Sequence, residues 1–173
     1  MTDAVACRAV RLLAFLLILP LPAVAKPTVS VREQWVSGTV ELSTPYVEVM
    51  RLLEDPRNVG RWDGRGATIT PRLAGECGEV DVDTPSPIGR LRYTERRCRT
   101  ADGWHSILLR SEDFDAYESR WVIQPREGGC SVLYELHTRP SVPVPGALLD
   151  RLTVRAVRRL LQSMSDTLGS LER

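Results

Sequence analysis

The sequence predicts an α+β domain in which a curved antiparallel sheet wraps around one long C-terminal helix. Three observations lead to this prediction. Residues 66–138 alternate apolar and polar side chains between turn residues, which is typical of antiparallel strands joined by short loops. Residues 147–171 repeat apolar side chains at steps of three and four, as an amphipathic helix does. Such a sheet and helix bury their apolar faces by packing on each other.

The N-terminal segment has the features of an export signal. Arg8 and Arg11 form a basic start, an apolar run follows, and residues 23–25 (Ala-Val-Ala) have the small side chains of a cleavage site. The run is broken by prolines and is shorter than the roughly 20 residues of a membrane-spanning helix, so we favour cleavage over an uncleaved anchor. We predict a cleaved signal peptide at residues 1–25, a single domain at residues 26–173, and an exported protein, periplasmic or secreted.

The charge balance argues against a nucleic-acid partner. The chain has 23 basic and 22 acidic residues. Without the two arginines and one aspartate of the signal segment, 21 of each remain, so the mature protein is close to neutral. A protein that coats nucleic acid needs a net basic footprint, and we therefore expect no such partner.

The first predicted elements are a strand and two short helices. Residues 28–42 are rich in β-branched side chains and predict one long strand. Thr44 is then the expected N-cap of a helix with Pro45 at its first position. This helix should end at Asp55, which precedes a proline, and residues 57–62 should add a single extra turn.

Six further strands, bounded by turn residues, bring the predicted sheet to about seven. Their ranges are 66–73, 78–83, 88–99, 104–112, 117–124 and 130–138. Their alternation predicts one buried and one solvent-exposed face. The proline-rich segment 139–146 ends the sheet before the final helix.

This order of elements resembles the START-like, polyketide cyclase/dehydrase superfamily (SRPBCC type), whose members share the helix-grip fold. The resemblance covers roughly residues 29–171. Three segments carry it, namely TPYVEVMRLLEDPRNVGRWDG (44–64), YESRWVIQPREGGCSVLYELHTRP (117–140) and VPVPGALLDRLTVRAVRRLLQSM (142–164). It implies a cavity between the concave sheet and the last helix, where members hold lipids, sterols, polyketides or other apolar molecules.

The resemblance leaves three functions open. We expect an exported domain that binds or carries a hydrophobic small molecule or lipid without changing it, and that needs no cofactor. The alternative is a polyketide cyclase, aromatase or hydrolase-like enzyme that uses the same cavity, with Arg110, Glu112 and Tyr117 as acid, base or orienting groups. A third alternative is a filled cavity and a protein-binding surface. The superfamily has no universal catalytic motif, so no catalytic residue is assigned.

Candidate cavity residues come from the inward parity of the strands, from the last helix and from the segment that follows the first helix. Small-molecule pockets are mostly apolar with a few polar groups, although each of these residues could also be plain core packing. Trp62 is expected to cap the open end. The full set is Trp62, Leu91, Tyr93, Arg110, Tyr117, Trp121, Ile123, Tyr134, Leu149 and Leu152.

The environment of Arg110 depends on the register of strand 104–112. If Trp104 and Leu108 face inward, strict alternation buries Arg110 and Glu112, and buried charges need partners. A one-residue offset places both in solvent instead. We favour the solvated alternative, because charged residues are seldom fully buried.

The histidines and cysteines offer structural roles rather than a metal site. His105 and His137, the only histidines, lie by parity on the face opposite Tyr134 and lack a third ligand, so we expect no metal. Cys77 and Cys98 flank the TPSP hairpin on its outer face. They are compatible with a cross-strand disulfide, although its strict geometry leaves free thiols as the alternative. Cys130 is expected to be a buried free thiol.

The last helix carries several arginines off its apolar stripe. These could contact an anionic membrane surface transiently while the cavity delivers its cargo. A solvated helix face is the alternative that we favour, because such charge stripes are common. We expect the protein to be a monomer.

Overall fold

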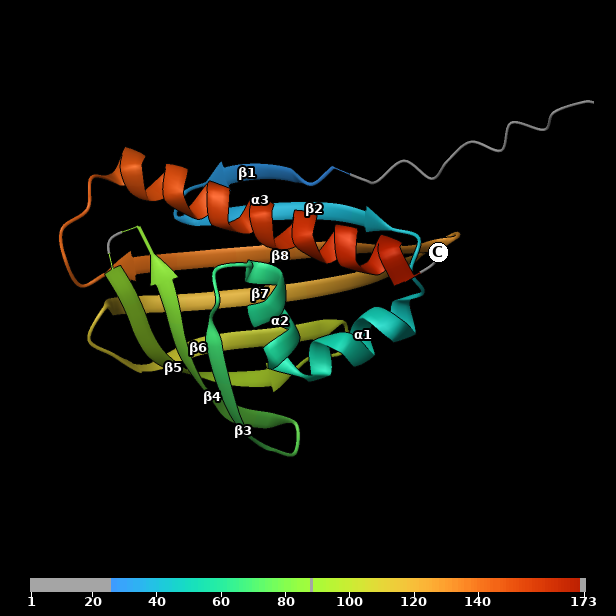
Figure 1. The fold of residues 1–173 in the computed structure, drawn as a ribbon, viewed down its shortest axis with the longest axis horizontal. Helices are drawn as coiled ribbons and strands as arrows, with labels where there is room; N and C mark the ends of the chain where they lie inside the picture. The colour runs from blue at the N-terminus through green and yellow to red at the C-terminus, as the bar shows by residue number, and fades with distance from the viewer. Residues whose placement is uncertain (1–25, 88, 172–173) are drawn as a thin grey trace, which may run out of the picture.

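The computed structural model describes residues 26–87 and 89–171, which form one curved sheet around a long helix (Figure 1). The strands are β1 (Thr28–Arg32), β2 (Trp35–Leu42), β3 (Thr68–Ala74), β4 (Cys77–Ser86), β5 (Gly89–Arg99), β6 (Gly103–Ser111), β7 (Phe114–Arg126) and β8 (Gly129–Pro140), and the helices are α1 (Tyr46–Glu54), α2 (Pro56–Asp63) and α3 (Gly146–Leu171). All neighbouring strands are antiparallel, in the order β1-β2-β8-β7-β6-β5-β4-β3. The α+β prediction is confirmed.

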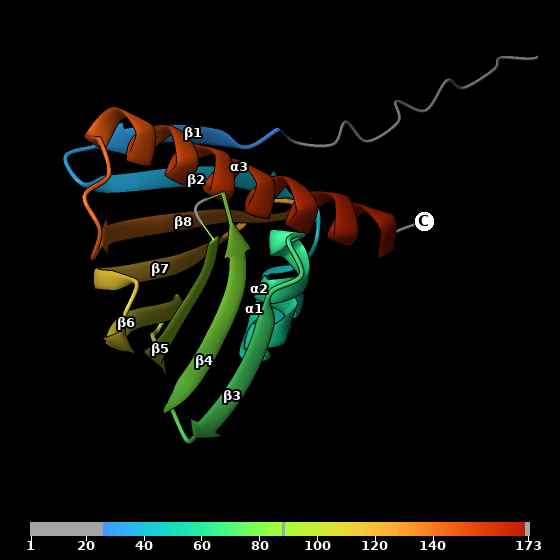
Figure 2. The ribbon, with the colours of Figure 1, turned by 60° about the vertical axis from the view of Figure 1, so that its left-hand side comes forward.

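The sheet bends so strongly that its two ends face each other (Figure 2). Helix α3 packs on β1, β2 and β8 at one end, whereas α2 packs on α3 and on β3 at the other. The two short helices therefore close the side that the sheet leaves open. The described part of the chain contains no helix that is long and apolar enough to cross a membrane.

The expected single strand at residues 28–42 is wrong, because β1 and β2 form a hairpin. They pair antiparallel from Thr28 with Thr39 to Arg32 with Trp35. Glu33 lies in the turn with a φ of 55°, a region that residues other than glycine seldom occupy. The turn lacks the Asn-Gly or Asp-Gly signature of a two-residue hairpin loop. For this reason the sequence of residues 28–42 predicts one continuous strand. The described sheet consequently has eight strands rather than about seven.

The helix starts also differ from the prediction. Pro45, not Thr44, is the N-cap of α1, and no side chain caps that helix. The expected extra turn is a full helix, α2. The Asp55 carboxylate caps its N-terminus by accepting a hydrogen bond from the Arg57 amide at 3.0 Å. Gly64 ends α2 in the left-handed conformation that favours glycine.

A β-bulge in β6 decides the environment of Arg110. Leu108 pairs with Glu95 and Arg110 pairs with Thr94, so Leu109 is an extra residue between them. The bulge reverses the inward and outward alternation beyond it. Trp104 at the other end of the strand is buried, whereas the Arg110 side chain is 65% exposed and lies near Glu79 and Asp81 on the outer face. The inclusion of Arg110 among the cavity residues is therefore corrected.

The remaining outer-face residues lie where their parity places them. Cys77 and Cys98 are directly paired across β4 and β5 and form a disulfide. His105 Nε2 contacts Glu118 Oε1 at 2.8 Å, and His137 Nδ1 lies 2.9 Å from the carbonyl oxygen of Gln34. Among the described residues, no three His, Cys, Asp or Glu side chains cluster as metal ligands.

Cys130 is a buried free thiol among the described residues. Burial raises the pKa of this thiol to about 11, so it stays protonated at neutral pH and behaves as a small apolar side chain.

Candidate ligand cavity

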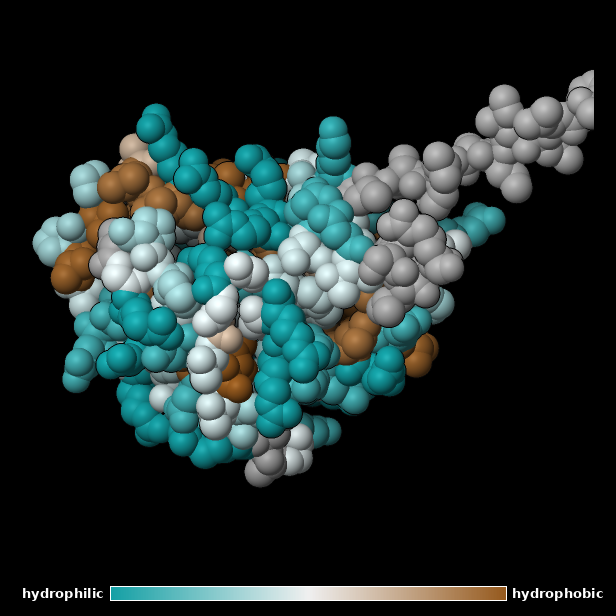
Figure 3. Space-filling view, viewed as in Figure 1, coloured by the Kyte–Doolittle hydropathy of each residue, from teal (hydrophilic) through white to brown (hydrophobic). Residues whose placement is uncertain are grey.

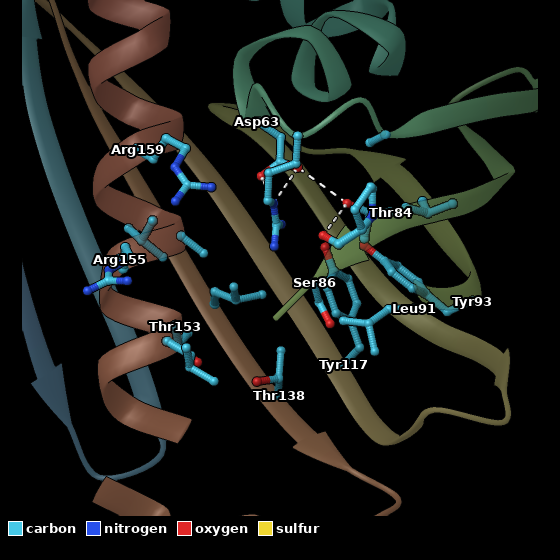
Figure 4. A pocket seen from close by; sticks show the side chains of 18 of the residues that line it. Asp63, Thr84, Ser86, Leu91, Tyr93, Tyr117, Thr138, Thr153, Arg155 and Arg159 are labelled. Atoms are coloured by element: carbon cyan, nitrogen blue, oxygen red, sulfur yellow. Dashed lines mark hydrogen bonds and ion pairs between the residues drawn. The ribbon is translucent and has the colours of Figure 1, made fainter. Parts of the chain in front are cut away.

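A cavity of about 370 Å³ lies between the concave face of the sheet and α3 (Figure 4). Strands β3, β4, β5, β7 and β8 contribute to it together with α2 and α3. The space persists because a strongly curved sheet and a single helix do not meet along their whole length. Its walls are mostly apolar, and the aliphatic side chains in them include Ile69, Val82, Leu91, Leu136, Leu149 and Leu152.

Three tyrosines form an aromatic wall of the cavity. Tyr93 and Tyr117 lie with ring centroids 4.7 Å apart, and Tyr134 stacks on Trp121 at 4.3 Å. The Tyr117 hydroxyl donates a hydrogen bond to Ser119 Oγ at 3.4 Å. Burial raises the pKa of all three phenols, and the nearby Glu95 carboxylate raises it further. At neutral pH they are therefore protonated hydroxyls, which can both donate and accept hydrogen bonds.

Behind this wall lies a buried charged pair, Glu95 and Arg97, which are 5% and 3% exposed. The Ser106 hydroxyl donates to Glu95 Oε1 at 3.0 Å, and Arg97 donates to the carbonyl oxygen of Leu53 at 2.8 Å. Burial raises the pKa of the Glu95 carboxyl, although Arg97 opposes the shift. Burial also lowers the pKa of Arg97.

Sequence reasoning missed Glu95 and Arg97, although a signal was present. Strand parity predicts that Leu91 and Tyr93 point inward, and the next two residues of the same parity are Glu95 and Arg97. The strand is so rich in charged residues that these two look like part of a solvated face. The structure instead buries them, and the Arg97 guanidinium lies 5.0 Å from the centre of the Trp104 ring.

The opening of the cavity is polar and charged. Asp63 at the end of α2 accepts two hydrogen bonds from Arg65 Nε, at 2.9 and 2.8 Å, and one from the Thr84 hydroxyl at 3.3 Å. Arg155 and Arg159 line the opening from α3 and are exposed. Sequence reasoning did not select these four charged residues for the cavity. Each lies on a helix or in a turn, where the direction of the side chain depends on the tertiary fold.

The structure brings six of the ten candidate residues together along the cavity. These are Leu91, Tyr93, Tyr117, Tyr134, Leu149 and Leu152. Trp62, Trp121 and Ile123 lie instead in the hydrophobic core, where close packing leaves them no part in the lining. The role of the six in ligand binding stays a prediction.

Comparison with known proteins identifies the fold. No protein-family model matches the sequence, and no curated protein matches it either. A START superfamily protein from Mycobacterium smegmatis superposes with a TM-score of 0.70 at 19% identity, over 80% of this chain and 99% of that chain. The protein has the START-like helix-grip fold. This confirms the structural resemblance inferred from the three sequence segments.

Other proteins with this START-like fold differ in what their names describe. The Zhui aromatase/cyclase of a Streptomyces species has a TM-score of 0.68 at 12% identity, over 80% of this chain and 95% of that chain. Human StAR-related lipid transfer protein 5 has a TM-score of 0.63 at 13% identity, over 89% of this chain and 90% of that chain. At such identities the likeness establishes the fold alone.

Proposed function

We propose that this START-like domain binds an apolar small molecule or lipid in the cavity between the sheet and α3 and holds it unchanged. The observation that carries the proposal is the cavity itself, about 370 Å³ in volume with mainly apolar walls. Small-molecule sites typically measure about 300–1,000 Å³ and combine apolar walls with a few polar groups. The lipid transfer protein and the aromatase/cyclase that share this fold are consistent with such a ligand.

The side chains of the cavity walls account for both the affinity and the orientation of the proposed ligand. Each methylene group that moves from water into the cavity contributes about 0.8 kcal/mol. The hydroxyls of Tyr93, Tyr117 and Tyr134 offer the polar contacts that favour one orientation of a ligand with a hydroxyl or carbonyl group.

Native mass spectrometry of the protein purified from its own compartment tests this proposal. We expect a non-covalent adduct that organic solvent extracts as an apolar molecule. Recovery of unliganded protein alone, combined with no binding of added decanol, would count against a ligand-binding function.

A second candidate, an enzyme of the cyclase or hydrolase kind, is favoured by the buried carboxyl of Glu95 behind Tyr117. Its raised pKa is a property of many acid–base groups in active sites. Of the three acid, base or orienting groups expected from sequence, Arg110 and Glu112 are exposed, whereas Tyr117 lines the cavity. If wild-type protein converts the extracted molecule and the Glu95→Gln variant does not, the enzyme is favoured. If neither protein changes the molecule, the carrier is favoured.

The proposal includes export. Residues 1–25, which carry the predicted signal, lie outside the described residues, but the Cys77–Cys98 disulfide is typical of an oxidising compartment. N-terminal sequencing of the protein from its natural source is expected to begin at Lys26. Recovery of intact Met1 on protein from the cytoplasm would contradict export.

We also propose that the protein is a monomer and that it contacts a membrane surface transiently. Val142, in the segment before α3, is 59% exposed, and Leu148, in the first turn of α3, is 45% exposed. Figure 3 shows hydrophobic residues gathered in this region beside a largely hydrophilic surface. Arg151 and Arg158 are exposed on the same helix, and basic residues beside apolar ones favour contact with anionic lipid.

A further inference from the structure

The opening of the cavity carries an excess of positive charge. The charged residues that line it are Asp63, Arg65, Arg155 and Arg159. One carboxylate therefore faces three guanidinium groups. Because the walls around these residues are apolar, the positive electrostatic potential at the opening is stronger than the same charges would produce on an open surface.

Arg65 is held in a fixed position by its neighbours. Asp63 binds its Nε through both carboxylate oxygens, and the buried Thr84 hydroxyl holds Asp63 in turn. The Arg65 and Asp63 side chains are only 25% and 14% exposed. Within the described residues the two terminal nitrogens of Arg65 form no hydrogen bond with protein, so they are free to donate to a ligand.

Arg159 reaches the same opening from the opposite side. Figure 4 shows its guanidinium extending from α3 toward the space beside Asp63. Arg155 lies one helical turn before it, where two like charges repel each other. In the part of the chain that the structure describes, neither arginine forms an ion pair, so their charge is left uncompensated at the cavity mouth.

We propose that the cavity takes an apolar carboxylic acid, whose hydrocarbon part lies between the sheet and α3 and whose carboxylate binds Arg159 and Arg65 at the opening. This inference rests on the proposed ligand-binding function and specifies its ligand class. Arginine binds carboxylates through paired, charge-assisted hydrogen bonds and is weakly hydrated, which suits a half-buried site. A singly charged carboxylate fits better than a doubly charged group, because Asp63 repels additional negative charge.

Isothermal titration with decanoate and decanol tests the ligand class, because the two differ only in the head group. We expect wild-type protein to bind decanoate about tenfold more tightly than decanol, as hydrogen bonds to charged groups warrant. Arg159→Gln should lower the decanoate affinity about tenfold and the decanol affinity by much less, because a neutral hydroxyl gains less from a guanidinium than a carboxylate does. The difference between the two ligands should shrink in high salt.

Arg158→Gln is the matched control, because it removes the same charge from the adjacent, exposed residue that does not line the cavity. It should leave both affinities unchanged. An equal loss of decanoate binding in both variants would show a general surface-charge effect and overturn the proposal. Equal affinities of the wild-type protein for decanoate and decanol would also overturn it.

Two further outcomes are distinguishable. If the protein binds decyl phosphate more tightly than decanoate, and Arg159→Gln removes this difference, then the preferred head group is a phosphate. That result would overturn the proposal of a carboxylic acid. Failure of decanoate and decanol alike to bind would refute the proposed ligand-binding function itself, whereas decanol binding without a preference for decanoate refutes only the acid-binding site.

Discussion

Replacement of Trp62 by alanine is expected to lower the free energy of unfolding by about 3–5 kcal/mol, as deletion of a buried aromatic side chain typically does. Trp62 is 4% exposed and belongs to the core that α1, α2, α3 and the sheet share. Its ring supports α2, and α2 in turn packs on α3 and β3. Urea denaturation followed by far-ultraviolet circular dichroism measures the change.

Trp35→Ala is the matched control, because it makes the same substitution on the outer face of the sheet. Trp35 is half-buried, with the Arg120 guanidinium 4.8 Å from the centre of its ring. Loss of this cation–π contact should cost about 1 kcal/mol. If Trp62→Ala destabilises the protein no more than Trp35→Ala does and instead changes ligand release, then Trp62 is the cavity cap that the sequence predicts and not a core residue.

Replacement of Ala156 by phenylalanine is expected to remove most of the ligand affinity while the protein stays folded. Ala156 lines the cavity from α3, so the added ring enters space that the ligand would fill. Exclusion of only three methylene groups would cost about 2.4 kcal/mol, at roughly 0.8 kcal/mol each, which is more than a tenfold loss of affinity. Isothermal titration with decanol measures the effect.

Ala147→Phe provides the control for this variant. Ala147 is exposed at the start of the same helix and does not line the cavity. The Ala147→Phe variant should therefore bind decanol with the same affinity as the wild-type protein. Undiminished binding in Ala156→Phe would place the ligand elsewhere on the molecule.

Much of the fold could be predicted from local pattern, because its main elements have strong periodicity. The steps of three and four in residues 147–171 predict α3, and the turn sequences predict six of the eight strands. Two features escaped prediction because they depend on single residues. The hairpin at Glu33 has no glycine to mark it, and the bulge at Leu109 reverses parity without any change in composition.

The cavity could be predicted only in part, for a related reason. Strand parity correctly points Leu91, Tyr93 and Tyr134 toward the space that α3 covers. Strand parity does not reveal which inward residues pack tightly against their neighbours. It therefore does not distinguish the cavity residues from Trp121 and Ile123, which belong to the core. That distinction depends on the distance between the curved sheet and the helix, which only the tertiary structure sets.

A crystal structure of the protein with decanol bound tests the central claim most directly. We predict electron density for the alkyl chain in the space bounded by Leu91, Tyr134 and Leu152, with the outer face of the sheet unoccupied. Density only on the protein surface, or a cavity closed by its own side chains, would contradict the claim that this fold holds an apolar ligand between its sheet and α3.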